Sequence, residues 1–226
     1  MTVLPDTVRI EYSSCAVNAS TYSARYMMDS IDTVKQTDCA LAFMIDSFSD
    51  VILNVTRYTE QTTPHQLTAG SGLVNGDVSV GKYVDVQLFV GGTALDEVEA
   101  ALIKIYYRHS DLDVNNNGLL NDTMDINETT LVIYHFNEST WVYTRLSLDL
   151  DWVHAMGVNT TDTEVYGELY AGYIWARVTR ISLFAVGGNV NTWSLLDQPV
   201  LLIVITISVI AGTMALVVLF LKRRRQ

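Results

Sequence analysis

An uninterrupted apolar run near the C-terminus constrains this chain more than any other feature. Residues 200–221 read VLLIVITISVIAGTMALVVLFL and include no charged side chain. A helix rises about 1.5 Å per residue, so a run of this length crosses the roughly 30 Å hydrocarbon core of a bilayer. A buried core helix is the alternative, but such helices usually keep one polar face. The sequence therefore predicts a transmembrane helix over residues 199–221, with Pro199 at its start.

The charges that flank this run predict its orientation. A basic tail, KRRRQ at 222–226, follows the helix directly, whereas residues 193–198 contain no Lys or Arg. Basic residues next to a membrane helix stay on the cytoplasmic side. We therefore expect a single-pass protein of the cell membrane, with residues 1–198 on the extracellular side and the C-terminus in the cytoplasm.

The N-terminus complicates this topology. Residues 1–25 lack the charged and apolar regions of a signal peptide. One alternative is a tail anchor with a cytosolic N-terminus, which would place the basic tail outside, against the charge rule. The others are a fragment of a longer precursor and an unusual export route. The charge rule favours the extracellular orientation.

The composition favours a glycosylated exterior and disfavours nucleic acid as a partner. The formal net charge is −11, and an acidic surface repels phosphate backbones. Asn-x-Ser/Thr sequons are more frequent than chance predicts, and they predict N-glycosylation at Asn18, Asn54, Asn121, Asn127, Asn137 and Asn159. In an oxidising exterior, the two cysteines, Cys15 and Cys39, are expected to form a disulfide, with two buried thiols as the alternative.

The segment before the membrane run has the pattern of an all-β protein. Short stretches rich in Val, Ile, Tyr and Thr alternate with turn clusters such as GSGLVNGD at 70–77. The expected strands are 8–12, 41–45, 51–58, 83–90, 101–107, 131–136, 141–148, 164–170, 173–178 and 182–186. One stretch of helix formers, ALDEVEAA at 94–101, lies between them. We expect one or two β-sandwich (Ig-like) modules.

The Gly-rich segment 68–77 suggests a boundary between two modules. The expected organisation is an N-terminal β-rich module at 1–75, a β-sandwich module at 76–188 and a juxtamembrane linker at 189–198. The alternative is that the Gly-rich segment is a hairpin loop within one domain. No internal repeat is evident.

The second half also resembles a known family. GKYVDVQLFVGG at 81–92, LVIYHFNESTWVY at 131–143 and ISLFAVGG at 181–188 occur in a familiar order. They resemble the β-sandwich domain near the C-terminus of many archaeal cell-surface proteins, the PGF-pre-PGF type. The matching positions are Leu131, Tyr134, Trp141, Ser182, Phe184, Ala185, Val186 and Gly187. The Pro-Gly-Phe processing signal of that family is missing here. The resemblance implies a structural or display role in an archaeal envelope, without catalysis.

One loop has the pattern of a calcium site. Residues 113–125 read DVNNNGLLNDTMD, the front half of an EF-hand loop, which also resembles dockerin loops. Hard Ca²⁺ prefers oxygen ligands, and Gly118 permits the sharp turn that brings them together. The predicted ligands are Asp113, Asn115, Asn117, Leu119 through its carbonyl, Asn121 and Asp125. The alternative is a plain turn, because Asn and Gly favour turns.

No pattern in the chain indicates catalysis. The four histidines are scattered without metal-ligand spacing, and no nucleophile motif is complete. We therefore predict a non-catalytic, membrane-anchored structural, adhesion or envelope-assembly protein, with other envelope proteins or glycans as its partners. One alternative is a surface receptor or solute-binding module, in which the Tyr- and Trp-rich stretch 166–175 forms a ligand face. The other is a membrane-tethered hydrolase.

Overall fold

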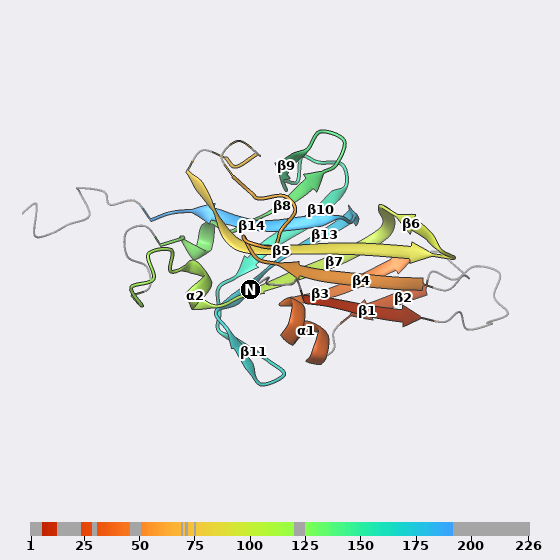
Figure 1. The fold of residues 1–226 in the computed structure, drawn as a ribbon, viewed down its shortest axis with the longest axis horizontal. Coiled ribbons are helices and arrows are strands. Elements are labelled where there is room, and N and C mark those ends of the chain that lie inside the picture. The colour runs from red at the N-terminus through yellow and green to blue at the C-terminus, as the bar shows by residue number, and fades with distance from the viewer. Residues whose placement is uncertain are drawn as a thin grey trace, which may run out of the picture. The chain divides into compact units, whose positions relative to one another are not determined.

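The computed structural model describes residues 6–12, 24–28, 31–45, 51–68, 70, 72–74, 76–119 and 125–191 (Figure 1). The strands are β1 (Asp6–Tyr12), β2 (Ala24–Met28), β3 (Cys39–Ile45), β4 (Val51–Tyr58), β5 (Asp77–Val90), β6 (Thr93–Leu95), β7 (Glu97–Tyr107), β8 (Val132–Asn137), β9 (Val142–Arg145), β10 (Val153–Asn159), β11 (Thr163–Val165), β12 (Glu168–Tyr170), β13 (Gly172–Arg180) and β14 (Leu183–Asn189). The helices are α1 (Ile31–Thr37), α2 (His109–Leu112) and the short 3-10 turn η1 (Glu128–Thr130).

Within these described ranges, no helix has both the length and the apolar character needed to cross a bilayer. The predicted span at 199–221 and the basic tail lie outside the described residues. The orientation of the chain in a membrane therefore stays a prediction.

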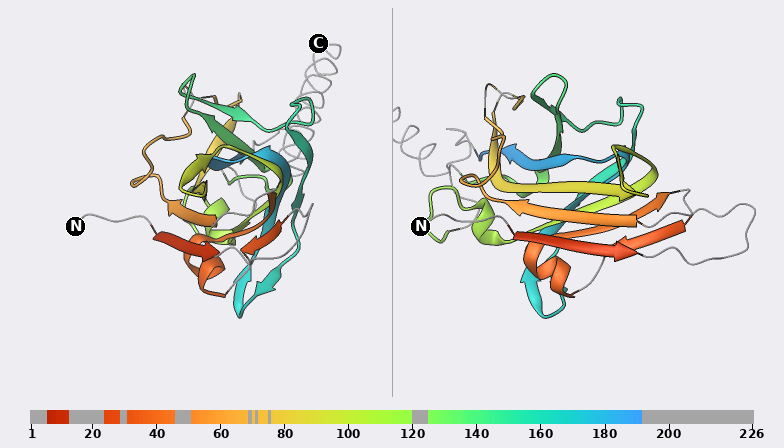
Figure 2. Two further views of the ribbon diagram at one scale, coloured as in Figure 1. Left: turned by 90° about the vertical axis from the view of Figure 1, so that its right-hand side faces the viewer. Right: turned by 45° about the vertical axis from the view of Figure 1, so that its right-hand side comes forward.

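Twelve of the described strands form two antiparallel sheets that pack face to face, and β11 and β12 form a separate hairpin, which confirms the predicted all-β class. The first sheet has the order β1-β4-β5-β14-β8-β9, with β6 paired to β5. The second has the order β10-β13-β7-β3-β2. In Figure 2, β1, β4, β5 and β14 follow one another across one layer. The hairpin of β11 and β12 projects beside α1.

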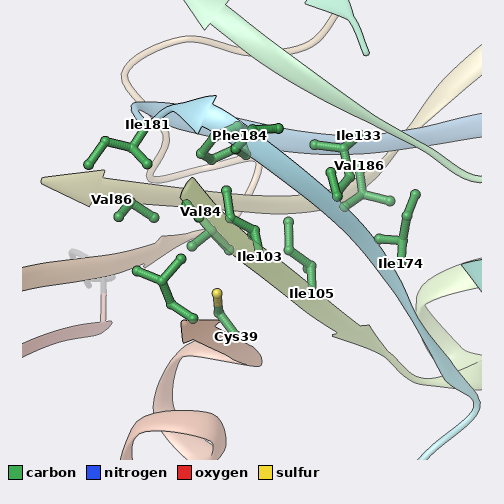
Figure 3. Close-up of a cluster of buried hydrophobic side chains, with 14 of the residues drawn as sticks. Cys39, Val84, Val86, Ile103, Ile105, Ile133, Ile174, Ile181, Phe184 and Val186 are labelled. Atoms are coloured by element: carbon green, nitrogen blue, oxygen red, sulfur yellow. The ribbon is translucent and has the colours of Figure 1, made fainter. Parts of the chain in front are cut away.

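Alternation along the strands explains why the sheets pack in this way. In β4, Val51, Leu53 and Val55 are buried, while the residues between them are less so. The inward side chains of both sheets make one continuous core, part of which is shown in Figure 3. Ile103 and Ile105 of β7 lie at its centre and are fully buried. Burying each such side chain contributes about 1.5–3 kcal/mol.

The two predicted modules are one compact unit. β4 pairs with β5, and β3 pairs with β7, so strands from both sides of the expected boundary at 75/76 share both sheets and one core. The chain up to Asn191 forms a single unit. The Gly-rich segment 68–77 belongs to the connection between β4 and β5, which are neighbours in the same sheet. This arrangement corresponds to the alternative in which the segment is a hairpin loop within one domain. A division there would leave the apolar faces of both parts exposed to water.

A second apolar cluster lies on the outer face of the first sheet. It is covered by the described residues between β4 and β5, namely 59–68, 70, 72–74 and 76, which we call the covering segment. Leu67 of this segment is buried in the cluster, and Leu73 packs against it. The other buried members are Tyr83, Val132, Tyr134, Phe136, Tyr143, Leu183 and Ala185.

Hydroxyl groups of buried tyrosines hold the covering segment in place. The Tyr83 hydroxyl donates to Glu60 Oε1 over 2.7 Å and accepts from the Leu67 amide over 3.0 Å. The Tyr143 hydroxyl donates to the His65 carbonyl over 2.8 Å. These bonds satisfy backbone groups that a segment outside the sheet ladder would otherwise leave to water.

Several predicted elements differ from the observed ones. The strand expected at 164–170 is a hairpin, because Tyr166 and Gly167 take positive φ values of 50° and 80° and turn the chain. The strand expected at 141–148 is shorter, since Trp141 (φ 57°) lies in the preceding turn. Strands β2, β6 and β10 and both α-helices were not predicted. The first residue of the expected linker 189–198, Asn189, is still part of β14.

The helix formers at 94–101 also belong to strands. β6 ends at Leu95, and β7 begins at Glu97. Val98 and Ala101 of this stretch are buried in the core between the sheets. Tertiary packing of an apolar face therefore outweighs local helix propensity here.

Candidate functional site

The predicted calcium loop closes on its own backbone. Asp113 Oδ2 accepts from the Gly118 amide over 2.9 Å, and Asp113 Oδ1 accepts from the Asn117 amide over 3.2 Å. Asn115 Oδ1 accepts from Asn117 over 3.0 Å, and Asn117 Oδ1 accepts from Leu119 over 2.7 Å. The left-handed conformation of Gly118 (φ 76°) lets the turn close. The first four predicted ligands therefore share one turn.

The other two predicted ligands do not join this turn in the described structure. Asn121 lies outside the described residues. Asp125 is 1% exposed, and its carbonyl accepts from the Asn191 amide over 2.7 Å. Among the described residues, no cluster of three or more His, Cys, Asp or Glu side chains could hold a metal ion. Calcium binding here stays a prediction.

Three of the predicted glycosylation sites share one local geometry. The side-chain oxygens of Asn127, Asn137 and Asn159 each accept a hydrogen bond from the amide two residues ahead, over 3.0, 3.0 and 2.8 Å. That amide belongs to the Ser or Thr of each sequon. The bond makes an Asx turn at the end of an element. In each case the carbonyl of the side chain is engaged within its own sequon.

Asn54 differs from those three sites. It lies within β4, where Arg9 and Gln87 are its partners in the neighbouring strands. Its Oδ1 is buried and has no hydrogen-bond partner in the described part of the chain. The remaining predicted sites, Asn18 and Asn121, lie outside the described residues.

One of the two predicted disulfide cysteines can be placed. Cys39 carries a free, fully buried thiol at the start of β3. Burial, followed by the nearby charge of Asp38, raises the pKa of this thiol to about 12. Cys15 lies outside the described residues, so the disulfide stays a prediction.

The aromatic stretch 166–175 contributes partly to the core. Tyr170 is fully buried and packs with Tyr106 beneath α1, at a ring-centroid distance of 5.0 Å. Tyr173 and Trp175 are half-buried on the outer face of the second sheet, and Tyr166 lies exposed at the tip of the β11–β12 hairpin. The stretch therefore does not form one continuous aromatic face.

An acidic groove lies between three turns of the sandwich. Two adjoining cavities, of about 300 and 290 Å³, share Asp96, Glu138, Ile181 and Ser182. Burial and the charge of Glu138 raise the pKa of Asp85 in the groove, although a hydrogen bond from Gln87 acts in the opposite direction.

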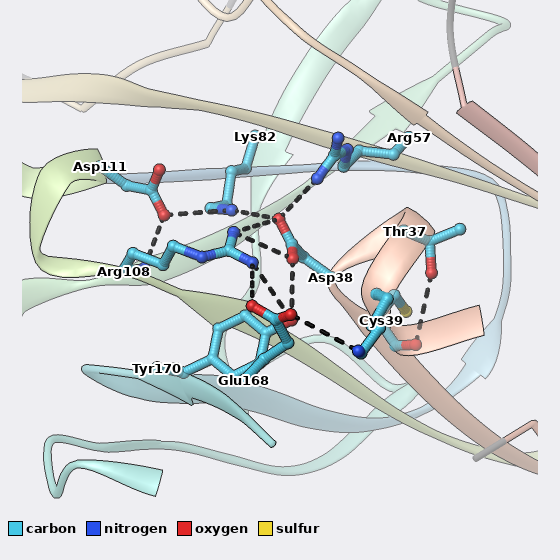
Figure 4. Close-up of polar contacts among 10 residues, drawn as sticks. Thr37, Asp38, Cys39, Arg57, Lys82, Arg108, Asp111, Glu168 and Tyr170 are labelled. Atoms are coloured by element: carbon cyan, nitrogen blue, oxygen red, sulfur yellow. Dashed lines mark hydrogen bonds and ion pairs between the residues drawn. The ribbon is translucent and has the colours of Figure 1, made fainter. Parts of the chain in front are cut away.

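A buried carboxylate at another place in the sandwich is the most densely contacted polar group. Asp38 Oδ2 accepts from Lys82 Nζ over 2.7 Å and from Arg57 over 2.8 Å. Asp38 Oδ1 accepts from the Tyr170 hydroxyl over 3.1 Å and from Arg108 over 3.2 Å. The side chain of Asp38 is 1% exposed, and that of Lys82 is 9% exposed. Figure 4 shows these groups converging on Asp38, and they come from β4, β5, β12 and the end of β7.

Additional carboxylates surround this centre. Asp111 Oδ2 lies 3.1 Å from Lys82 Nζ and accepts from the backbone amide of Arg108 over 2.6 Å. Glu168 bridges Arg108 and Lys35 over 3.9 and 3.6 Å. We call the seven residues Lys35, Asp38, Arg57, Lys82, Arg108, Asp111 and Glu168 the Asp38 network.

The backbone explains why Asp38 is directed inward. It follows the last turn of α1 with a φ of 50°, a left-handed conformation that Asp tolerates better than most residues. Its amide donates to the Val34 carbonyl over 2.8 Å, which caps the helix. Its own carbonyl accepts from the Tyr106 amide over 2.8 Å, so both of its backbone groups are anchored.

Charge keeps this carboxyl ionised. Burial alone would raise the pKa of Asp38, but the charges of Lys82, Arg108 and Arg57 outweigh burial and lower it below its usual value. The Asp38 network could not be predicted from the sequence, because its members are far apart in the chain and belong to no motif. An inward-facing Lys82 between the apolar residues of β5 was the one available signal.

Comparison with protein-family models gave no match, and neither did comparison with curated proteins.

Proposed function

We propose that this chain is a membrane-anchored, glycosylated cell-surface protein whose single β-sandwich serves a structural or adhesion role in an envelope, without catalysis. The shared turn geometry at Asn127, Asn137 and Asn159 is the observation that carries this proposal. Three of the six sequons lie in turns whose side-chain oxygen is already bonded within the sequon. An exterior location would explain why these motifs recur, because the Asn side chains would then accept glycans.

The remaining observations support the same function. The apolar run at 199–221 follows the last described residue, Asn191, after a short segment, and the basic tail predicts that the sandwich lies outside. An acidic chain with a net charge of −11 resists self-association at a crowded surface. Calcium in the turn that begins at Asp113 would stiffen a loop next to α2.

The experiment that tests the proposal measures topology in intact cells that express the full chain. A membrane-impermeant protease should digest the sandwich and leave only the membrane segment with its short tail. Full protection of the sandwich, together with the absence of any glycan, would place the N-terminal part in the cytosol and reject the proposal.

Glycan mapping gives a sharper version of the same test. The variants Asn127→Gln, Asn137→Gln and Asn159→Gln should each lose the mass of one glycan. The matched control, Asn54→Gln, should lose none, because Asn54 is held within a central strand of the folded sandwich. Peptide mass spectrometry after glycan release measures each site. Modification of Asn54 but of none of the three turn sites would contradict the structural argument.

A further inference from the structure

The shortest ion pair in the Asp38 network joins an amine to a carboxylate across the two sheets. Lys82 comes from β5 of the first sheet, and Asp38 immediately precedes β3 of the second sheet. Lys82 Nζ lies 2.7 Å from Asp38 Oδ2, and both side chains are almost completely buried. Asp111 Oδ2 lies on the same amine at 3.1 Å. This arrangement holds a nucleophile, an acyl group and a proton acceptor together (Figure 4).

We propose that Lys82 and Asp38 condense into an intramolecular isopeptide bond, with Asp111 as the proton carrier. Lys82 Nζ gives one proton to Asp111 and attacks Cγ of Asp38, so that a new C–N bond forms. The C–Oδ2 bond then breaks. Oδ2 leaves as water with two of the three ammonium protons, one of them returned by Asp111, and the third stays on the amide nitrogen. The ion pair contains every atom of the amide and the water, so no other reactant is needed.

The groups around the carboxylate stabilise the charge that this reaction develops. Oδ1, which would carry the negative charge of the tetrahedral intermediate, accepts from the Tyr170 hydroxyl and from Arg108. These two donors are already in place, as in an oxyanion hole. Oδ2, the leaving oxygen, accepts from Arg57 over 2.8 Å. Arg108 also donates to Oδ2 over 3.2 Å, so both oxygens of Asp38 have hydrogen-bond donors in place.

Burial favours the product over the ion pair. A desolvated ammonium and carboxylate recover only part of their lost hydration through mutual attraction. Amide formation removes both charges without changing the net charge of the network. The water that is released leaves a site in which Lys82 is 9% exposed and Asp38 is 1% exposed. Hydrolysis, the reverse reaction, requires water to enter this site.

Asp111 is positioned for its role by the backbone. Its Oδ2 is fixed by the Arg108 amide at 2.6 Å, and its side chain is 23% exposed. An amide side chain at this position would keep the size of Asp111 but would lack the basicity needed to accept a proton. Asp111→Asn is therefore the variant that separates the reaction from the fold.

The expected crosslink would join the two layers covalently. It would connect positions 44 residues apart in the chain and would prevent the sheets from separating during unfolding. A sandwich at an exposed surface would then resist force and heat to a degree that its size alone does not provide. This inference goes beyond the proposed function, because the chemistry depends only on the folded sandwich and not on its location.

The test is peptide mapping of the full chain, purified in detergent and digested with trypsin after denaturation. A crosslink blocks cleavage after Lys82 and joins the tryptic segments 36–57 and 58–104 into one branched peptide. Its expected mass is the sum of the two segments less one water. Fragment spectra should locate the bond between Lys82 and Asp38. The peptide masses from the wild-type chain show whether the crosslink is present even if the variants fold poorly.

Three variants complete the experiment. Lys82→Met should abolish the joined peptide. Asp111→Asn should yield mainly separate peptides while its near-ultraviolet circular dichroism stays native. The matched control is Lys35→Met, which removes another ion-paired lysine of the Asp38 network. It should keep the crosslink, in a joined peptide of segments 26–57 and 58–104, because trypsin no longer cleaves after position 35. Complete cleavage after Lys82 in the wild-type chain, with segments 36–57 and 58–82 at full mass, would overturn the proposal. A joined peptide that persists in Asp111→Asn would overturn the role of Asp111.

Discussion

The imidazole of His135 packs against two aromatic side chains in the sandwich. Its ring centroid lies 4.8 Å from that of Trp152 and 5.5 Å from that of Phe184. Burial, followed by the charge of Arg180, lowers the pKa of His135 to about 4. The folded chain therefore keeps this histidine neutral at a pH where an exposed histidine would be charged.

This histidine predicts a dependence of stability on pH. Between pH values of about 4 and 6.5, the unfolded chain binds a proton at His135 and the folded chain does not, so stability rises with pH across this window. The contribution is on the order of 3 kcal/mol across the whole window. His135→Phe should remove this part of the slope, measured by urea unfolding at several pH values. Ser139→Ala, in the neighbouring turn, should keep it. An unchanged slope in His135→Phe would show that the histidine is solvated in the folded state.

At the scale of elements, the covering segment shows how a stretch without strands becomes part of the fold. Glu60, His65 and Leu67 of this segment are held by side chains of β5 and β9 and not by a sheet ladder. The sequence indicated a Gly-rich loop here but not what the loop covers. In the sequence, Tyr83 and Tyr143 cannot be distinguished from other strand residues, because the groups that their hydroxyls bind lie 23 and 78 residues away.

Removal of one of these hydroxyl groups should loosen the covering segment. Tyr83→Phe leaves the Leu67 amide without its partner, which costs about 1–3 kcal/mol. Amide hydrogen exchange should become faster in residues 60–67 and stay unchanged in the second sheet.

Tyr107→Phe is the matched control for this experiment. It deletes another buried tyrosine hydroxyl, which donates to Glu128 and to the Asn159 carbonyl. This variant should lose stability without faster exchange in residues 60–67. Equal exchange rates in the two variants would show that the hydroxyl of Tyr83 does not anchor the segment.

At the scale of the whole molecule, the sandwich is built from both halves of the chain. β5 lies between β4 and β14, and β7 lies between β3 and β13, so each half supplies neighbours to strands of the other half. A cut between residues 75 and 76 would therefore expose central strands and both core faces.

We expect neither half of the sandwich to fold alone. The fragment 76–191 should show no cooperative unfolding transition by circular dichroism, because β5 and β7 would each lose one neighbouring strand. The full chain should unfold its β-structure in one transition in urea. Two separate transitions, or a fragment 76–191 with dispersed amide resonances, would support two independent modules instead.

Local features explain what the sequence could predict by itself. Alternation of apolar residues is a property of a few neighbouring positions, so strands such as 51–58 and the all-β class follow from it. The turn chemistry of Asn and Gly likewise indicated the turn that begins at Asp113. Predictions failed where positive φ values interrupt an apolar stretch, as at Tyr166, and where the core faces of β6 and β7 include helix formers.

Only the tertiary structure decided which strands pair and which polar groups meet. The period of a strand identifies its buried face but not its neighbour, because pairing depends on how all the faces pack together. Asp38 and Lys82 are 44 residues apart, strands β6 and β7 lie between Lys82 and Asp111 in the sequence, and nothing local marks the three residues as partners. They come together because Asp38 immediately precedes β3, Lys82 faces inward from β5, and Asp111 follows the end of β7. The sequence predicted a β-rich chain, and long-range packing placed a buried amine beside a buried carboxylate.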